Sequence, residues 1–147
     1  MAAEDGFPMA LGMQHCATWG EYVDVWSRWR CGVDLPEGNV PSTLLVAEVG
    51  RELVGRASVR FALNDWLLAY GGHIGYGVVP AWRRRGCATE ILRQALVVAR
   101  AGGVDRCLLT CDDGNVGSAT VIERCGGVLE DVVPDEDGRP LRRYWID

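Results

Sequence analysis

The sequence of 147 residues contains no lysine, and all 15 of its basic residues are arginines. This absence excludes functions that need a lysine side chain. A Walker A phosphate loop, a Schiff-base enzyme and a pyridoxal-phosphate site each depend on one. The formal net charge is −5, so a run of three arginines at positions 83 to 85 stands out and needs its own explanation.

Histidine is nearly absent as well, because only His15 and His73 are present. So few imidazoles argue against a histidine-rich metal centre, and we expect no bound metal. The six cysteines form no Cys-x-x-Cys pair, which argues against a zinc knuckle and a thioredoxin-type site. We expect reduced, half-buried thiols at positions 16, 31, 87, 107, 111 and 125.

Long apolar segments are missing too. No apolar run approaches the roughly 20 residues that a membrane-spanning helix needs. Residues 1–14 include Glu4 and Asp5 but no basic residue, unlike the start of a secretory signal. The acidic net charge disfavours broad binding to nucleic acid or to anionic membranes. We therefore expect a cytoplasmic protein whose partner is neither a nucleic acid nor a membrane.

The length suits one domain, residues 1–147, with a single core. Apolar residues at three- and four-residue steps predict helices over 18–30 and 86–101. The first fourteen residues make no convincing strand, and residues 34–42 read as a loop. Alternation and turn residues predict a short helix over 115–125 and strands over 43–49, 53–61, 73–79, 104–111, 128–133 and 141–146.

From residue 43 the predicted order is β-β-β-α-β-α-β-β. The first two strands form a hairpin, and a crossover helix follows the third strand. This order indicates an α/β fold of the α+β type, in which helices flank a mixed, mostly antiparallel central sheet. Residues 1–42 contribute a helix and a loop.

The informative stretch runs from residue 73 to residue 90, where a strand, a short basic loop and a helix follow one another. The first N–H groups of a helix lack partners and carry partial positive charge, which suits a pyrophosphate. Gly86 and Ala88 let a ligand approach the backbone closely. The arginines of the loop add forked donors for phosphate oxygens. A dinucleotide-binding reading fails, since Gly75 and Gly77 lie within the strand.

This stretch resembles the GNAT superfamily of N-acetyltransferases. The family signature Gln/Arg-x-x-Gly-x-Gly/Ala is matched by the run from Arg83 to Ala88, with Gly86 at the central glycine. Family members often continue with Asn-x-x-Ala-x-x-x-Tyr-x-x-x-Gly-Phe, which corresponds to residues 115–127 here. The resemblance extends over residues 43–147.

The resemblance implies a GNAT-like fold and an enzyme that moves an acetyl group from acetyl-CoA to an amine. Transfer would be direct, within a ternary complex, and the acceptor would be an unidentified small molecule or peptide. A homodimer is a further family expectation. Asn115 can also serve simply as a helix N-cap. The implied coenzyme-binding residues are Val78, Val79, Arg83, Arg84, Arg85, Gly86, Cys87, Ala88, Thr89, Asn115 and Ser118.

Two positions depart from the family pattern. Ile122 stands where the family has the tyrosine that protonates the leaving thiolate, and Gly127 replaces the usual Phe. On the family geometry we expect the Ile122 side chain to point toward the coenzyme sulfur. Because isoleucine cannot donate a proton, the identity of the acid is open.

Three other side chains are candidates for the chemistry. His73 is the only well-placed group that titrates near neutral pH, so it is a candidate base, although a structural role is the commoner one. Tyr76 could protonate or orient, and Glu48 could face the acceptor from the hairpin. Covalent catalysis by Cys87 or Cys125 is the weaker hypothesis.

Two other functions compete with acetyl transfer. Without the tyrosine, the chain could be a coenzyme A-binding sensor or partner module without transfer activity. A nucleotide- or nucleic-acid-binding role for the arginine run is disfavoured, because no aromatic residues are interleaved with these arginines.

Overall fold

The computed structural model describes residues 9–147, so the first eight residues of the stretch 1–14 lie outside the described part. A 3-10 turn, η2 (Met13–His15), precedes helix α1 (Trp19–Arg30). The Thr18 hydroxyl accepts the N–H of Glu21 at 3.1 Å, which caps the helix. Four aromatic rings contact one another edge-to-face along α1, from Trp19 to Trp29.

Six strands form two antiparallel sheets. The order is β1-β2-β3 in the first sheet and β4-β6-β5 in the second. The predicted α/β order and antiparallel pairing are confirmed. The strands are β1 (Ser42–Val49), β2 (Glu52–Arg60), β3 (Ile74–Val78), β4 (Cys107–Asp112), β5 (Val128–Pro134) and β6 (Pro140–Ile146).

The sequence predicts one central sheet, whereas β3 and β4 meet only at one end. There the N–H of His73 donates to the carbonyl of Leu108 at 2.7 Å. Gly72 allows this contact, because its φ is +67° and an added Cβ would lie 2.5 Å from the Leu108 carbonyl oxygen. The connection before it contains a π-helical turn, η3 (Leu67–Gly71), where the sequence indicates no regular element.

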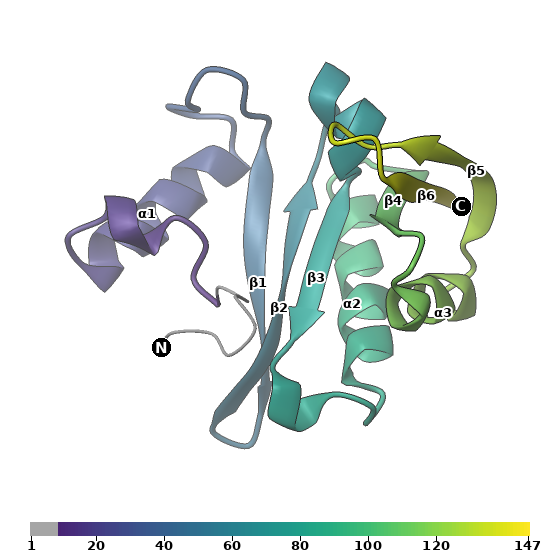
Figure 1. The fold of residues 1–147 in the computed structure, drawn as a ribbon. Coiled ribbons are helices and arrows are strands. Elements are labelled where there is room, and N and C mark those ends of the chain that lie inside the picture. The colour runs from purple at the N-terminus through teal and green to yellow at the C-terminus, as the bar shows by residue number, and fades with distance from the viewer. Residues whose placement is uncertain (1–8) are drawn as a thin grey trace.

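Helix α2 (Cys87–Ala101) crosses from β3 to β4, and α3 (Val116–Arg124) follows β4. Figure 1 shows α1 on one side of the first sheet and α2 on the other. The predicted apolar face of α2 is buried, since Leu92, Ala95 and Ala99 have no exposed surface. Within residues 9–147, no helix combines the length and the apolar character that crossing a membrane requires.

Candidate active site

A cleft of about 950 Å³ opens beside the free edge of β3. Its walls come from β3, from the loop and first turn of α2, and from α3. It brings together most of the residues that the family resemblance implies. The lining consists of Tyr76, Gly77, Val78, Arg83, Arg84, Gly86, Ala88, Thr89, Asn115, Val116, Gly117, Ser118, Thr120, Val121 and Arg124.

The N-terminus of α2 presents unpaired backbone donors to this cleft. Gly86 is the N-cap residue with φ +82°, and no side chain caps the helix. The first intrahelical bond runs from the N–H of Glu90 to the carbonyl of Gly86 at 3.2 Å, so the amides of residues 87–89 have no partner within the helix. Arg84 is also left-handed, with φ +59°. Such a turn at a helix N-terminus is a concave donor site for an anion.

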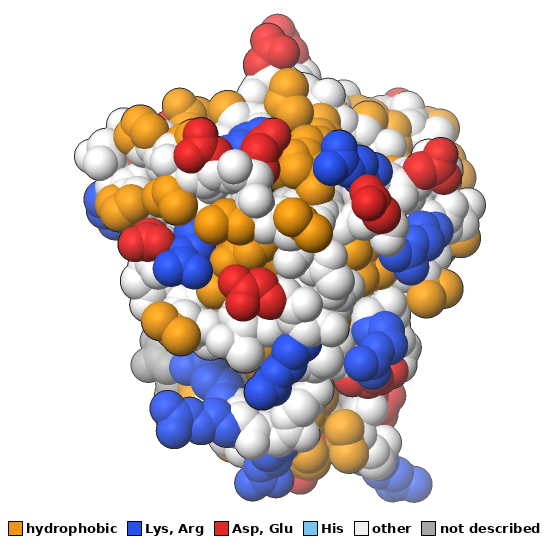
Figure 2. Space-filling model, turned by 90° about the vertical axis from the view of Figure 1, so that its right-hand side faces the viewer, with side chains coloured by type: hydrophobic (Ala, Val, Ile, Leu, Met, Phe, Trp, Pro, Cys, Tyr) orange, Lys and Arg blue, Asp and Glu red, His pale blue; other side chains and the backbone are white. Residues whose placement is uncertain are grey.

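Arginine side chains add positive charge to the same cleft. Arg83, Arg84 and Arg124 line it, and no Asp, Glu or His among residues 9–147 does. The Nε of Arg83 donates to the carbonyl of Val78 at 3.1 Å, which fixes the loop to the end of β3. Basic side chains gather on the lower part of the face that Figure 2 shows. This charge distribution favours a polyanionic ligand.

Arg85, Cys87 and Val79 do not line the cleft, although the resemblance implies them. The Arg85 guanidinium lies over the ring of Trp82, 5.0 Å from its centroid. Cys87 lines a second cavity on the other side of α2. The N–H of Val79 donates to the carbonyl of Val54 at 2.9 Å and is therefore committed to the sheet.

The hydrogen-bond pattern of β3 decides which of its amides reach the cleft. Bonds to β2 are made at Val79 and, through its carbonyl, at His73. Antiparallel ladders alternate, so the N–H groups of Tyr76 and Val78 point away from β2, toward the open edge. Of the two amides that the sequence offers for polarising a thioester carbonyl, Val78 is therefore suitable and Val79 is not.

One hydroxyl pair joins β3 to α3 inside the cleft. The Tyr76 hydroxyl lies 2.8 Å from the Ser118 Oγ, and either group can donate. Burial raises the pKa of Tyr76 to about 12, so this phenol stays protonated at neutral pH. Asn115 caps α3, because its Oδ1 accepts the N–H of Ser118 at 3.1 Å. The pair thus holds a phenolic donor where α3 approaches the strand edge.

His73 is placed at the junction of the two sheets rather than in the cleft. Its side chain is buried, and its Nδ1 accepts the N–H of Leu108 at 2.9 Å. Burial, and the positive charge of Arg60, lower the pKa of His73. The ring is therefore neutral, and its lone pair is already used. This geometry favours the structural role over the role of a base.

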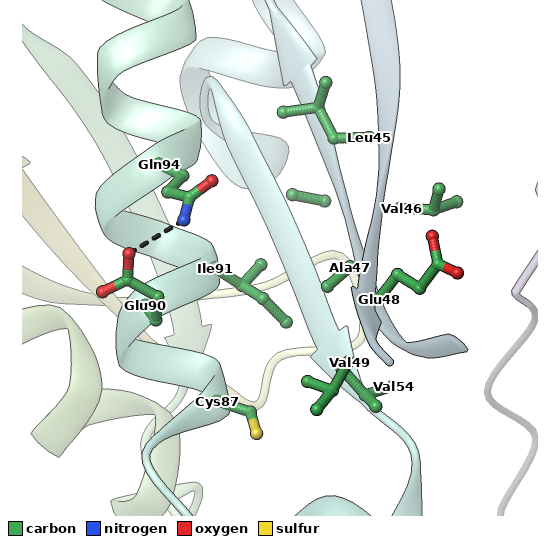
Figure 3. A pocket seen from close by; sticks show the side chains of 11 residues that line it. Leu45, Val46, Ala47, Glu48, Val49, Val54, Cys87, Glu90, Ile91 and Gln94 are labelled. Atoms are coloured by element: carbon green, nitrogen blue, oxygen red, sulfur yellow. Dashed lines mark hydrogen bonds between the residues drawn. The ribbon is translucent and has the colours of Figure 1, made fainter. Parts of the chain in front are cut away.

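Glu48 also lies outside the cleft, on the exposed edge strand β1. Figure 3 shows the second cavity, of about 370 Å³, between α2 and the β1–β2 hairpin. Leu45 and Ile91 point into it, whereas the carboxylate of Glu48 points away from α2. A bulge between Ala47 and Glu48 interrupts the register there. The structure does not bring Glu48 together with Tyr76 and His73.

The expectation that Ile122 points into the cleft is wrong. Its side chain has no exposed surface and belongs to the hydrophobic core, together with Leu92 and Tyr144. Its neighbour Val121 lines the cleft instead. Gly127 packs directly on Ile122, because an added Cβ would lie 2.8 Å from the Ile122 carbonyl oxygen.

Several lining residues are absent from the sequence-based set. Gly117, Thr120, Val121 and Arg124 form one face of α3 at three- and four-residue steps. This periodicity was the available signal, and the positively charged end of the face, Arg124, fits the anion-binding loop opposite. Among residues 9–147, no group of three or more His, Cys, Asp and Glu side chains could hold a metal ion. All six cysteines are free thiols.

Comparison with known proteins identifies the family. The sequence model of the acetyltransferase (GNAT) domain matches residues 16–128, which is more than half of the chain. The chain therefore belongs to the GNAT acetyltransferase family, and its chemical class is acyl transfer. No curated protein matches the sequence.

Solved structures share the fold at low sequence identity. The microcin C7 self-immunity acetyltransferase MccE, in complex with acetyl-CoA and AMP, is 21% identical with a TM-score of 0.57; the alignment covers 71% of this chain but only 60% of MccE. YncA from Salmonella typhimurium, a protein described as an acetyltransferase and bound to acetyl-CoA, is 18% identical (TM-score 0.61; 87% and 72% covered). A variant of the spermidine N-acetyltransferase SpeG from Vibrio cholerae is 16% identical (TM-score 0.62; 88% and 75% covered).

Proposed function

We propose that this chain binds acetyl-CoA in the cleft beside β3 and transfers its acetyl group to an amine. The observation that carries the proposal is the left-handed Arg84–Gly86 turn at an uncapped helix N-terminus, among arginines and without a lining carboxylate. Such a turn binds a pyrophosphate through the amides of residues 87–89. MccE and YncA were solved with acetyl-CoA, which supports the same ligand here.

The chemistry follows from two donors along β3. The Val78 N–H polarises the thioester carbonyl and stabilises the oxyanion that forms on attack. The protonated Tyr76 hydroxyl donates a hydrogen bond to the departing thiolate, with Ser118 orienting it. Acetyl transfer is direct, within a ternary complex, because holding both reactants side by side supplies much of the rate.

The acceptor must arrive with a neutral amine. An alkyl amine with a pKa near 10.4 is neutral in only about one molecule in 2,500 at pH 7. Among residues 9–147, no Asp, Glu or His lines the coenzyme cleft to take the proton. The rate should therefore rise with pH toward the pKa of the acceptor itself. The acceptor is a small-molecule or peptide amine; SpeG, for comparison, is named as a spermidine N-acetyltransferase.

The site assignment is tested by Gly86→Glu against Gly138→Glu. The two glycines share φ values of +82° and +79°, and neither has an atom within 4 Å of an added Cβ. Both variants therefore carry the same backbone strain, but only the first places a carboxylate beside the pyrophosphate. Calorimetry should show that Gly86→Glu binds acetyl-CoA about tenfold more weakly, or weaker still, because the like charges repel each other. Gly138→Glu should bind it normally.

Transfer itself is tested by mass spectrometry of amines incubated with acetyl-CoA and the protein. Acetylated product from at least one amine supports the proposal that the chain is an enzyme. Acetyl-CoA binding that Gly86→Glu weakens, without any acetylated product, supports the coenzyme A-binding module instead. Equal acetyl-CoA affinity in the two glycine variants would contradict the assignment of the coenzyme site to the Gly86 turn. The cytoplasmic location and the homodimer stay predictions.

A further inference from the structure

Strand β2 carries polar side chains on the face that points away from α2. Alternation places Ala57 and Val59 in the core against α2, so Ser58 and Arg60 lie on the opposite face. The register sets Ser58 opposite Gly75 of β3. Because glycine has no side chain, both polar groups lie directly against the backbone of β3, where Ser58 is buried with 4% of its surface exposed.

The guanidinium of Arg60 is a partly buried cation whose partners are neutral. Its Nη1 donates to the carbonyls of Gly71 at 3.3 Å and Gly72 at 3.4 Å. Among residues 9–147, no Asp or Glu oxygen lies within 4 Å of it. Burial and the nearby charge of Arg56 lower the pKa of Arg60, so its surroundings disfavour the positive charge. A guanidinium that remains charged in such a place gains from an anion.

A hydroxyl and a guanidinium converge on one point. A Cβ added to Gly75 would lie 3.4 Å from the Ser58 Oγ and 3.6 and 3.8 Å from the two Nη atoms of Arg60. Both groups therefore reach the surface of Gly75 itself. A carboxylate or a phosphate beside Gly75 would accept hydrogen bonds from both, and charge-assisted bonds of this type are stronger than those between neutral groups.

The position of this cluster relates it to the reaction. Tyr76 lines the coenzyme cleft, and its neighbour Gly75 faces the other side of β3. Strand β3 thus separates the cleft from the Ser58–Arg60 cluster. A coenzyme that fills the cleft leaves this opposite side for the acceptor. Gly75 and Val78 are three residues apart, which is about 10 Å along a strand.

We propose that the acceptor is an amine that also carries a carboxylate or phosphate group, bound by Arg60 and Ser58 above Gly75. This proposal rests on the proposed acetyl transfer and adds the class of acceptor to it. The spacing along β3 fits an anion separated from the amine by a short chain, as in an ω-amino acid. A polyamine, which carries positive charge throughout, would be repelled by the same cluster.

The test compares acceptors that differ only in charge. The panel contains ω-amino acids from glycine to 6-aminohexanoate, their carboxamides, and aminoalkyl phosphates of matching length. Product is measured by mass spectrometry, because the six free thiols of the protein would react with thiol-detecting reagents. We expect the acids or the phosphates to have kcat/KM values about 10- to 150-fold above the carboxamides, the range that one charge-assisted bond gives. The comparison of acids with phosphates identifies the preferred anion.

Three variants connect the preference to the cluster. Arg60→Gln should abolish it, Arg60→Lys should keep part of it, and Arg30→Gln, at an exposed position on α1, should leave it unchanged. Acetyl-CoA affinity, measured for each variant, reports on folding. Calorimetry with 6-aminohexanoate and coenzyme A-bound protein gives a second readout that does not need turnover.

The outcomes separate the two proposals. Carboxamides acetylated as fast as the acids, or an acid preference that survives in Arg60→Gln, would overturn the anionic acceptor while leaving acetyl transfer intact. If no amine of any charge is acetylated and 6-aminohexanoate still binds in an Arg60-dependent manner, acetyl transfer fails and the anion site stands. Absence of both turnover and binding overturns both.

Discussion

Replacing Tyr76 with phenylalanine tests how the thiolate leaves. The change removes one hydroxyl, which lies 2.8 Å from Ser118, and keeps the ring that packs against the core. The pKa of Tyr76 is about 12, whereas a thiol has a pKa near 8.5. Complete proton transfer from the phenol to the thiolate is thus uphill by about 3.5 pH units, or about 5 kcal/mol.

This difference makes Tyr76 a hydrogen-bond donor rather than an acid that gives up its proton in the rate-limiting step. A hydrogen bond to a charged group contributes about 1.5–3 kcal/mol, which corresponds to a loss of about 10- to 150-fold in kcat for Tyr76→Phe. Acetyl-CoA affinity should change little. Because the phenol stays protonated, the loss should be constant with pH across the neutral range.

The assay is steady-state acetylation of the best acceptor, followed by mass spectrometry from pH 6 to pH 9. Tyr70→Phe is the matched control, since Tyr70 lies outside the cleft lining and contacts Trp66. Ser118→Ala should cost less than Tyr76→Phe, because it only loosens the hydroxyl. A kcat for Tyr76→Phe within twofold of the wild type, in a protein that binds acetyl-CoA normally, would refute the reasoning.

Two further predictions concern buried residues. His73→Ala leaves the Leu108 N–H without its acceptor and should cost about 1–3 kcal/mol of unfolding free energy in urea titrations, whereas His73→Asn, which keeps an acceptor, should cost less. The lowered pKa of His73 means that the unfolded state binds the proton more readily, so stability should fall as the pH drops below about 6.5, and this dependence should vanish in His73→Asn. Wild type and His73→Asn should share one kcat–pH profile; loss in the variant of a rise in kcat with pH in the acidic range would instead assign His73 as the base. Ile122→Tyr should destabilise by about 1–3 kcal/mol through overpacking and should not raise kcat, and a stable variant with a faster rate would show that the side chain reaches the cleft.

The sequence predicts the elements well because local signals agree with one another. Where the helices begin and end is set by residues close in the sequence. The Thr18 cap, the apolar periodicity of α2 and the glycine that follows α2 act without help from distant residues. The single contact between the ends of β3 and β4 was not predictable, since it depends on Gly72 meeting Leu108 across 36 residues. A glycine in a loop looks the same in sequence whether or not a backbone carbonyl lies against it.

The candidate site shows the same division. The anion-binding turn at Gly86 follows from residue type and position, because a small residue at a helix start is a local property. Which amides and side chains face the cleft depends instead on strand register. Val79 is used by β2, and Arg85 turns toward Trp82, although both lie within the matching motif. A motif therefore identifies the segment, and the hydrogen-bond ladder selects its members.

Ile122 and Gly127, the two departures from the family pattern, are in direct contact with each other. Ile122 fills the core beneath the cleft, and a Cβ added to Gly127 would meet both its side chain and its backbone carbonyl, so a larger residue at 127 requires the backbone of α3 to shift there. Losing a hydroxyl from α3 in this way does not leave the cleft without one. Tyr76 supplies a phenol from β3. Its hydroxyl contacts Ser118, which lies on the face of α3 that lines the cleft. If Tyr76 supports thiolate departure, the donor of this chain lies on strand β3, whereas the family resemblance implies one on α3.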